Sequence, residues 1–282
     1  MPKLGEINYL KALGAEGANH ALNKPFADEC CGRYLSDLGI VMRLLPEPPA
    51  RVLDLGVGSG WTTAFLARRG YEVVGQDICE DMIELAEQNR VAYGVDTASF
   101  VVQDYESMAF RDEFDAAFFY DALHHAEDEA AALQAVYRAL KPGGTCVTVE
   151  PGEGHALASQ FAIERFGVTE KDMPPHHIID VARRVGFREF RIYARPTEPQ
   201  PVIDCGAVGS MASPEPSRWR VASGFLRKMV RVLLKGSRPP DVDYLFNLGL
   251  SDIRLLPTAS SPGDVVHSAR ILRDSNIVWM RK

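Results

Sequence analysis

Residues 50–77, ARVLDLGVGSGWTTAFLARRGYEVVGQD, constrain the fold more than any other stretch of the sequence. They predict a buried strand, a glycine-rich turn, a helix that ends at Gly70 and a second strand that ends in an acid. Strand and helix patterns then alternate up to Glu150, as in a parallel sheet with helices on both faces. Because such crossovers are right-handed, the sequence predicts an α/β fold with a doubly wound, mainly parallel sheet.

The pattern divides the chain into four segments. Residues 1–50 look mostly helical and irregular, and residues 51–195 carry the alternating strands and helices of the predicted core. Residues 196–217 are rich in Pro, Ser and Gly, whereas NIVWMRK at the C-terminal end predicts a last strand. We therefore expect residues 196–274 to be an insertion between the last two strands, and residues 275–282 to complete the core.

The composition argues against several classes of protein. The chain has 282 residues and a net charge of −7, so nothing favours general binding to nucleic acid. Its five cysteines are odd in number and form no CxxC pair, which indicates reduced thiols and no metal site. No apolar run reaches about 18 residues and the N-terminus lacks a secretory signal, so we expect a cytoplasmic protein.

The glycine turn is preceded by an acid. Gly56, Gly58 and Gly60 alternate, whereas a dinucleotide-binding fingerprint would need its third glycine at Trp61. Asp54 stands two residues before the first glycine, where its charge would repel a pyrophosphate. An amino acid fits better, because its ammonium group suits the carboxylate and its own carboxylate suits the helix start. The turn thus favours a nucleoside that carries an amino acid.

Two further strands end in an acid. Asp77 ends the second strand, where an acid can accept hydrogen bonds from ribose hydroxyls. Asp104 ends the third strand beside Tyr105, where a carboxylate can accept from an adenine amine. Taken singly, either acid could instead cap a helix or a turn. Adenosine joined to an amino acid is the simplest ligand that uses all three acids.

At these residues the chain resembles the class I, Rossmann-like S-adenosylmethionine-dependent methyltransferases. The resemblance rests on VLDLGVGSG, on GQD and VVQD, on FDAAFFYDALHHAED, and on ALKPGG followed by TCVTVE. It covers residues 51–150 well, and residues 186–193 and the final strand less well. It implies S-adenosylmethionine as cofactor, methyl transfer to an oxygen, nitrogen or carbon nucleophile, and seven strands whose last two form an antiparallel hairpin.

The resemblance also implies which residues contact the cofactor. Asp54 would hold the methionine part directly or through water, Asp77 the ribose and Asp104 the adenine, while Tyr120 and Asp121 would border the sulfonium. The full set of predicted cofactor contacts is Asp54, Gly56, Gly58, Gly60, Asp77, Ile78, Met82, Asp104, Tyr105, Tyr120 and Asp121.

Two histidines are candidate catalytic bases. His125 lies where the resembled family often has a histidine, and His155 follows the fifth strand, at a position that often faces the acceptor. A histidine with a pKa of about 6.5 can take a proton from an acceptor hydroxyl, although positioning alone can also drive methyl transfer. Since His124 and His125 are adjacent, at most one can point into the site from a helix or strand.

Two other features of the sequence allow more than one interpretation. His176 and His177 lack further ligands that we can place, so we predict no metal site. Residues 217–236, SRWRVASGFLRKMVRVLLKG, predict a basic amphipathic helix, which suits a lid, a homodimer contact or a peripheral contact with an anionic membrane.

The sequence therefore predicts an S-adenosylmethionine-dependent methyltransferase with a small-molecule acceptor, such as a sugar, a quinone-like metabolite or a lipid-linked compound. A non-catalytic protein that binds S-adenosylmethionine or S-adenosylhomocysteine also fits the pattern. An NAD-dependent oxidoreductase fits less well, because of Asp54 and Trp61.

Overall fold

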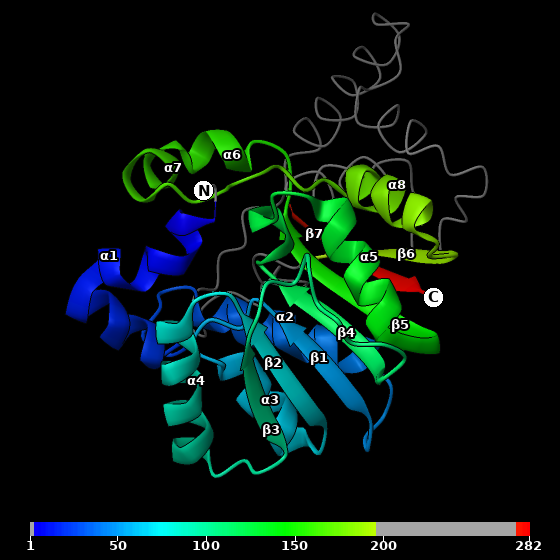
Figure 1. Cartoon of the computed structure of the whole chain (residues 1–282), viewed down its shortest axis with the longest axis horizontal. Coiled ribbons are helices and arrows are strands. Elements are labelled where there is room, and N and C mark those ends of the chain that lie inside the picture. The colour runs from blue at the N-terminus through cyan, green and yellow to red at the C-terminus, as the bar shows by residue number, and fades with distance from the viewer. Residues whose placement is uncertain (1–2, 196–274) are drawn as a thin grey trace, which may run out of the picture. The chain divides into compact units, whose positions relative to one another are not determined.

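The computed structural model of the chain describes residues 3–195 and 275–282. Their centre is a seven-stranded sheet in the order β3-β2-β1-β4-β5-β7-β6, shown in Figure 1. The strands from β3 to β5 in this order run parallel, whereas β7 is antiparallel to both β5 and β6. The predicted sheet and its closing antiparallel hairpin are confirmed. The strands are β1 Arg51–Leu55, β2 Glu72–Asp77, β3 Ala98–Val102, β4 Phe114–Tyr120, β5 Leu140–Pro151, β6 Glu189–Ala194 and β7 Ser275–Arg281.

Helices cover the sheet, with α2 and α3 behind it and α5 and α8 in front of it in the view of Figure 1. Helix α5 packs against α8, and α8 against β7. None of the helices in the described ranges is long and apolar enough to cross a membrane. The helices are α1 Leu4–Leu22, α2 Cys31–Leu44, α3 Trp61–Arg69, α4 Glu80–Tyr93, α5 Glu129–Ala139, α6 His155–Ala158, α7 Gln160–Phe166 and α8 Pro175–Val185, with a 3₁₀ turn, η1, at Leu123–His125.

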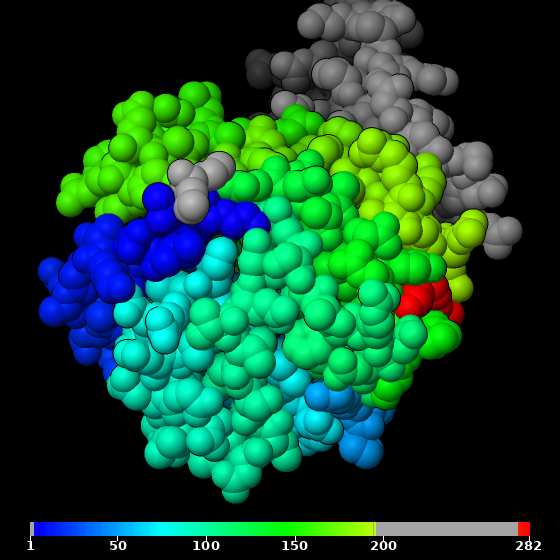
Figure 2. Space-filling view, viewed as in Figure 1, coloured from blue at the N-terminus to red at the C-terminus, as the bar shows by residue number. Residues whose placement is uncertain are grey.

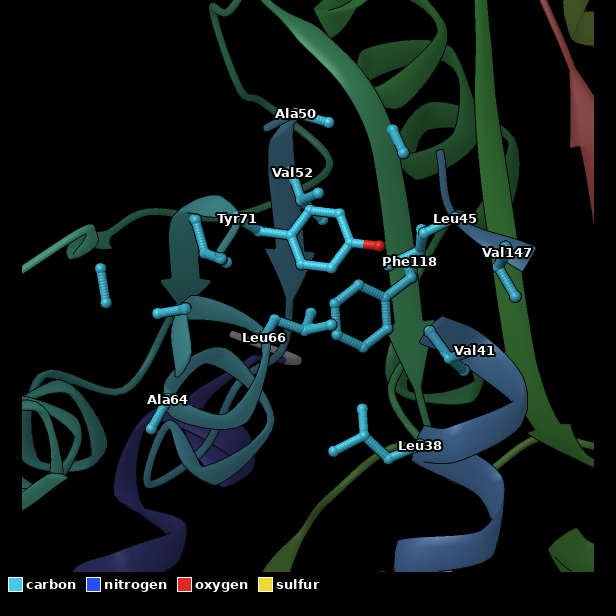
Figure 3. Packing of buried hydrophobic residues seen from close by; sticks show 14 of the residues in the cluster. Leu38, Val41, Leu45, Ala50, Val52, Ala64, Leu66, Tyr71, Phe118 and Val147 are labelled. Carbon is cyan, nitrogen blue, oxygen red and sulfur yellow. The ribbon is translucent and has the colours of Figure 1, made fainter. Parts of the chain in front are cut away.

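A buried apolar cluster joins the sheet to α2 and α3 (Figure 3). Leu38 and Val41 of α2 and Leu66 of α3 pack with Val52 of β1 and Phe118 of β4. Burying each such side chain contributes about 1.5–3 kcal/mol. The cluster therefore fixes β1 and the start of α3, which lie on either side of the glycine turn.

Two details after β4 follow from local structure. Helix α5 ends at Ala139, before the Pro-Gly-Gly at residues 142–144, because Leu140 already pairs with Phe114 and begins β5. The short helices α6 and α7 follow β5. Helices of one or two turns are too short for apolar residues to show a helical period.

Residues 196–274 lie outside the described part of the chain, and with them the predicted insertion, Cys205 and the basic helix at 217–236. The division into four segments therefore stays a prediction. Cys30, Cys31, Cys79 and Cys146 are free thiols, as expected.

Candidate functional site

A cavity of about 240 Å³ lies at the carboxyl ends of β1, β2 and β3, where doubly wound sheets bind ligands. Most of the predicted cofactor contacts line it, whereas Asp54, Gly60, Tyr120 and His155 are not among its lining residues. The predicted residues on its wall are Gly56, Gly58, Asp77, Ile78, Met82, Asp104, Tyr105, Asp121 and His125. We call it the first cavity.

The glycine turn approaches its neighbours closely. All three glycines have a positive φ, between 52° and 71°, a region that costs other residues about 1–2 kcal/mol. A Cβ on Gly56 would lie 2.7 Å from the Cβ of Ala122, and one on Gly60 would lie 2.8 Å from the Cβ of Ala86. Nothing lies within 4 Å of the Cβ position of Gly58, so the turn leaves open space there.

Asp77 ties the turn to the start of α4. One carboxylate oxygen accepts from the backbone N–H of Gly58 at 2.8 Å, and the other from the N–H of Cys79 at 2.9 Å. Burial raises the pKa of Asp77, and these N–H groups partly offset the rise. Because a carboxylate can accept about four hydrogen bonds, Asp77 keeps acceptor capacity for a ligand in the first cavity.

The N-terminal segment adds residues that the sequence reading missed. Lys3 forms ion pairs with Asp104 and with Glu106, the latter at 2.9 Å. The carboxylate predicted to accept from the adenine amine, that of Asp104, is therefore paired with a lysine. Glu6 and Tyr9 of α1 also line the first cavity. Figure 2 shows the N-terminal helix, in blue, between the cyan α4 side and the green α7 segment, and α1 contacts both helices. No local pattern in residues 1–22 indicates this placement.

Asp54 lies beneath the turn and is almost completely buried. One of its carboxylate oxygens accepts from the hydroxyls of Thr62 and Thr63 at the start of α3, at 2.7 and 2.6 Å. Burial raises the pKa of Asp54 to about 7, although the two hydroxyls oppose the rise. Through these hydrogen bonds Asp54 stabilises the connection between the glycine turn and α3. Its contact with the methionine part of the cofactor stays a prediction.

Tyr120 and Asp121 belong to a network around Arg195. The Tyr120 hydroxyl donates to the buried Asp37 at 2.8 Å, away from the first cavity. The buried Arg195 guanidinium lies 2.8 Å from Asp37 and 3.2 Å from Asp121. Asp121 has a φ of 46°, rare for a residue other than glycine, and lines the first cavity. The network therefore holds the Asp121 carboxylate at the cavity wall, on a backbone in the left-handed region.

A second cavity, of about 500 Å³, adjoins the first, and both are lined by Glu6, Tyr9, Lys24, Asp121 and His125. Both adjacent histidines line this second cavity, with their ring centroids 4.0 Å apart. The expectation that only one of them can face the site fails, because they belong to the 3₁₀ turn rather than to a helix or strand.

His125 is held in the form of a base. Its Nδ1 lies 2.7 Å from the carbonyl oxygen of Thr169, which can only accept, so Nδ1 carries the proton and Nε2 keeps a lone pair. Burial and the neighbouring charge of His124 lower the pKa of His125 to about 4. His125 is therefore neutral at neutral pH.

Carboxylates surround His124 and His155. Glu150, fully buried, lies 2.7 Å from Nδ1 of His124, and Glu170 lies 3.4 Å from its Nε2. Burial would lower the pKa of His124, but the hydrogen bond to Glu150 and the nearby charge of Glu170 outweigh it and raise the pKa to about 10. His155 lines the second cavity, with Nε2 2.7 Å from Glu170. The sequence pattern missed both glutamates, because they come from distant segments.

Comparisons with known proteins agree with this arrangement. Residues 53–148 match a family model described as a methyltransferase domain. The chain is 37% identical over 106 residues to demethylmenaquinone methyltransferase of Clavibacter sepedonicus, which covers 37% of this chain and 42% of the relative. It is 34% identical over 136 residues to ubiquinone biosynthesis O-methyltransferase of Xanthomonas campestris pv. campestris, which covers 48% of this chain and 52% of the relative. The chain thus spans about half the length of these curated relatives.

Solved structures share the fold. Haemonchus contortus phosphoethanolamine N-methyltransferase 2, solved in complex with S-adenosyl-L-methionine, aligns with a TM-score of 0.52 at 20% identity. The alignment covers 88% of this chain and 52% of that one. At this identity the likeness concerns the fold alone.

Proposed function

We propose that this chain is a class I S-adenosylmethionine-dependent methyltransferase, in line with its match to a methyltransferase domain model over residues 53–148, and that it transfers a methyl group to an oxygen, nitrogen or carbon atom of a small-molecule acceptor. One observation carries the proposal: a glycine turn and two strand-end acids line a cavity that adjoins a second, histidine-lined cavity. The first cavity suits a cofactor, and the second suits an acceptor.

The residues of the first cavity fit the cofactor by their chemistry. Asp77 would accept from the ribose hydroxyls, since it is an acceptor at the cavity wall with capacity to spare. Asp104, with Tyr105 beside it, would accept from the adenine amine. Lys3 would then either share the Asp104 carboxylate with this amine or move away from it. When bound, S-adenosylmethionine supplies an electrophilic methyl group on its sulfonium.

Other parts of the wall would hold the rest of the cofactor. Gly58 leaves open space that the methionine part would use, and Asp54 holds the turn through its hydrogen bonds to the start of α3. Asp121 would border the sulfonium, because it faces both cavities. Tyr120 would act on this region through Asp37 and Arg195.

His125 is the base that we favour. It lines both cavities, it is neutral at neutral pH, and its Nε2 lone pair is available to an acceptor hydroxyl. His155 is the second candidate, although Glu170 already engages its Nε2 at 2.7 Å.

A quinone-like phenol is the acceptor class that we propose first. One of the two relatives is named a demethylmenaquinone methyltransferase, and the other a ubiquinone biosynthesis O-methyltransferase. The second cavity also carries the aromatic rings of Tyr9 and Tyr34, which suit a planar acceptor. Sugars and lipid-linked compounds remain the alternatives to test.

Calorimetric titration with S-adenosylhomocysteine tests the cofactor half of the proposal, and we expect one site per chain. Methyl transfer from labelled S-adenosylmethionine to a panel of hydroxylated quinols, sugars and amines tests the other half. The variant His125→Asn should bind S-adenosylhomocysteine like the wild type and lose turnover. A folded chain that binds neither S-adenosylmethionine nor S-adenosylhomocysteine contradicts the proposal, and tight binding without turnover on any acceptor favours a non-catalytic binding protein.

A further inference from the structure

We propose that His124, His125 and Glu170 form a binding site for a divalent transition-metal ion, such as Zn²⁺, Mn²⁺ or Co²⁺. Each residue offers one ligand atom, and the three atoms lie within 4.8 Å of one another. Two histidine nitrogens and one carboxylate are a common ligand set for such ions at sites that keep a position open for a substrate.

Both histidines are oriented as metal ligands usually are. Nδ1 of His124 lies 2.7 Å from a carboxylate oxygen of Glu150, and Nδ1 of His125 lies 2.7 Å from the carbonyl oxygen of Thr169. Each Nδ1 therefore donates its hydrogen, and a neutral ring keeps its lone pair on Nε2. A metal-bound histidine almost always donates its other N–H to a carboxylate, a backbone carbonyl or water in this way.

The spacing of the ligand atoms suits a small ion. Nε2 of His124 lies 3.4 Å from Oε2 of Glu170, which is longer than an ordinary N–H···O hydrogen bond. Two atoms that each lie about 2.1 Å from a tetrahedral ion are about 3.4 Å apart. Nε2 of His155 lies 2.7 Å from the same oxygen of Glu170 and so fixes the carboxylate. The third ligand thus also has an orienting partner.

The charges around His124 also favour a cation. Within the described ranges, the ion pairs of Glu150 and Glu170 involve histidines only. The Glu150 side chain is fully buried, and that of Glu170 is 11% exposed. Glu150 accepts from the backbone N–H groups of Ala122, Leu123 and His124, and a divalent ion would add the full positive charge that buried carboxylates favour beside them.

The site lies where it can affect the proposed reaction. All three ligands line the second cavity, and His125 lines the first as well. A divalent ion lowers the pKa of a hydroxyl bound to it, so it would replace His125 in activating an acceptor hydroxyl. This consequence rests on the proposed function, but the metal site itself does not.

The test is calorimetric titration of the full, tag-free chain, treated first with EDTA and dialysed, with ZnCl₂, MnCl₂ and CoCl₂. We expect one ion per chain, and with Co²⁺ a visible d–d absorption band that is stronger than that of the free aqua ion. Glu170→Gln and His124→Asn should each weaken binding at least tenfold, and Glu150→Gln should weaken it about 10–100-fold through the orientation of His124. The matched control is His20→Asn, which removes an exposed histidine of α1 and should change nothing.

S-adenosylhomocysteine binding, measured on the same samples, shows that each variant is folded and separates the two proposals. A wild type that binds S-adenosylhomocysteine but none of the three ions overturns the metal site alone. Ion binding that survives in Glu170→Gln and His124→Asn overturns it as well. Ion binding without any S-adenosylhomocysteine binding supports the metal site and contradicts the proposed function.

Discussion

Replacing Asp77 by alanine should weaken the binding of S-adenosylhomocysteine by about 10²–10⁴-fold. The carboxylate already accepts two backbone N–H groups, and its remaining acceptor capacity faces the first cavity. Two ribose hydroxyls that donate to it would each contribute about 1.5–3 kcal/mol, as hydrogen bonds to a charged group do. Since 1.4 kcal/mol corresponds to a tenfold change in Kd, their loss gives the stated range.

The same change also affects the fold, and the two effects must be separated. Asp77→Ala leaves the N–H groups of Gly58 and Cys79 without their acceptor, which costs about 1–3 kcal/mol for each group that stays buried. Asp77→Asn keeps the shape and one acceptor oxygen, so its affinity should lie between those of the wild type and the alanine variant. Asp81→Ala removes a carboxylate from the first turn of α4 that does not line the first cavity, and it should bind like the wild type.

Calorimetric titration with S-adenosylhomocysteine at 25 °C measures the affinities, and urea unfolding of each variant without ligand measures its stability. A folded Asp77→Ala variant whose Kd lies within threefold of the wild-type value would refute the assignment of Asp77 to the ribose. An equal loss in Asp81→Ala would refute the reasoning from position, because a general change in charge would then explain both.

Three further changes test the fold and the site. Gly60→Ala should lower the free energy of unfolding by about 2–4 kcal/mol, because the new Cβ would stand on a backbone with a φ of 71° and lie 2.8 Å from the Cβ of Ala86. Urea unfolding measures this loss of stability, and a loss below about 0.5 kcal/mol contradicts the prediction. Tyr120→Phe should lower the free energy of unfolding by about 1–3 kcal/mol in the same assay, because the buried Asp37 carboxylate loses a hydrogen-bond donor. An unchanged unfolding midpoint would contradict this and mean that water or Arg195 replaces the Tyr120 hydroxyl. The pKa of His125, about 4 against about 6.5 unfolded, predicts stability that is present above pH 6.5 and declines as the pH falls towards 4. His125→Asn should therefore lose less stability than the wild type between pH 7 and pH 5, and equal losses would show that other groups dominate.

The sequence predicted the sheet because its strands and helices carry their own periodic patterns. The strand-end acids Asp77 and Asp104 were placed on one cavity by a rule of topology, which needs only the order of parallel strands. Asp54 also lies near the carboxyl end of a parallel strand, but its side chain does not line the first cavity. It stands one residue before the end of β1, and its side chain turns under the glycines towards Thr62 and Thr63. A strand pattern places a residue along the sheet, but the helix packed on that face decides what the side chain meets.

The histidine cluster could not be predicted in this way, because its parts share no local pattern. His124 comes from η1, Glu150 from β5, His155 from α6, and Glu170 from the segment before α8. Each alone is an ordinary polar residue, and only the packing of these segments around the second cavity brings the rings and carboxylates within hydrogen-bond distance. Burying so many ionisable groups costs folding free energy, and such clusters of perturbed groups concentrate at functional sites. The cluster is therefore the first place at which to test for chemistry, and the metal titration asks whether it binds a cation.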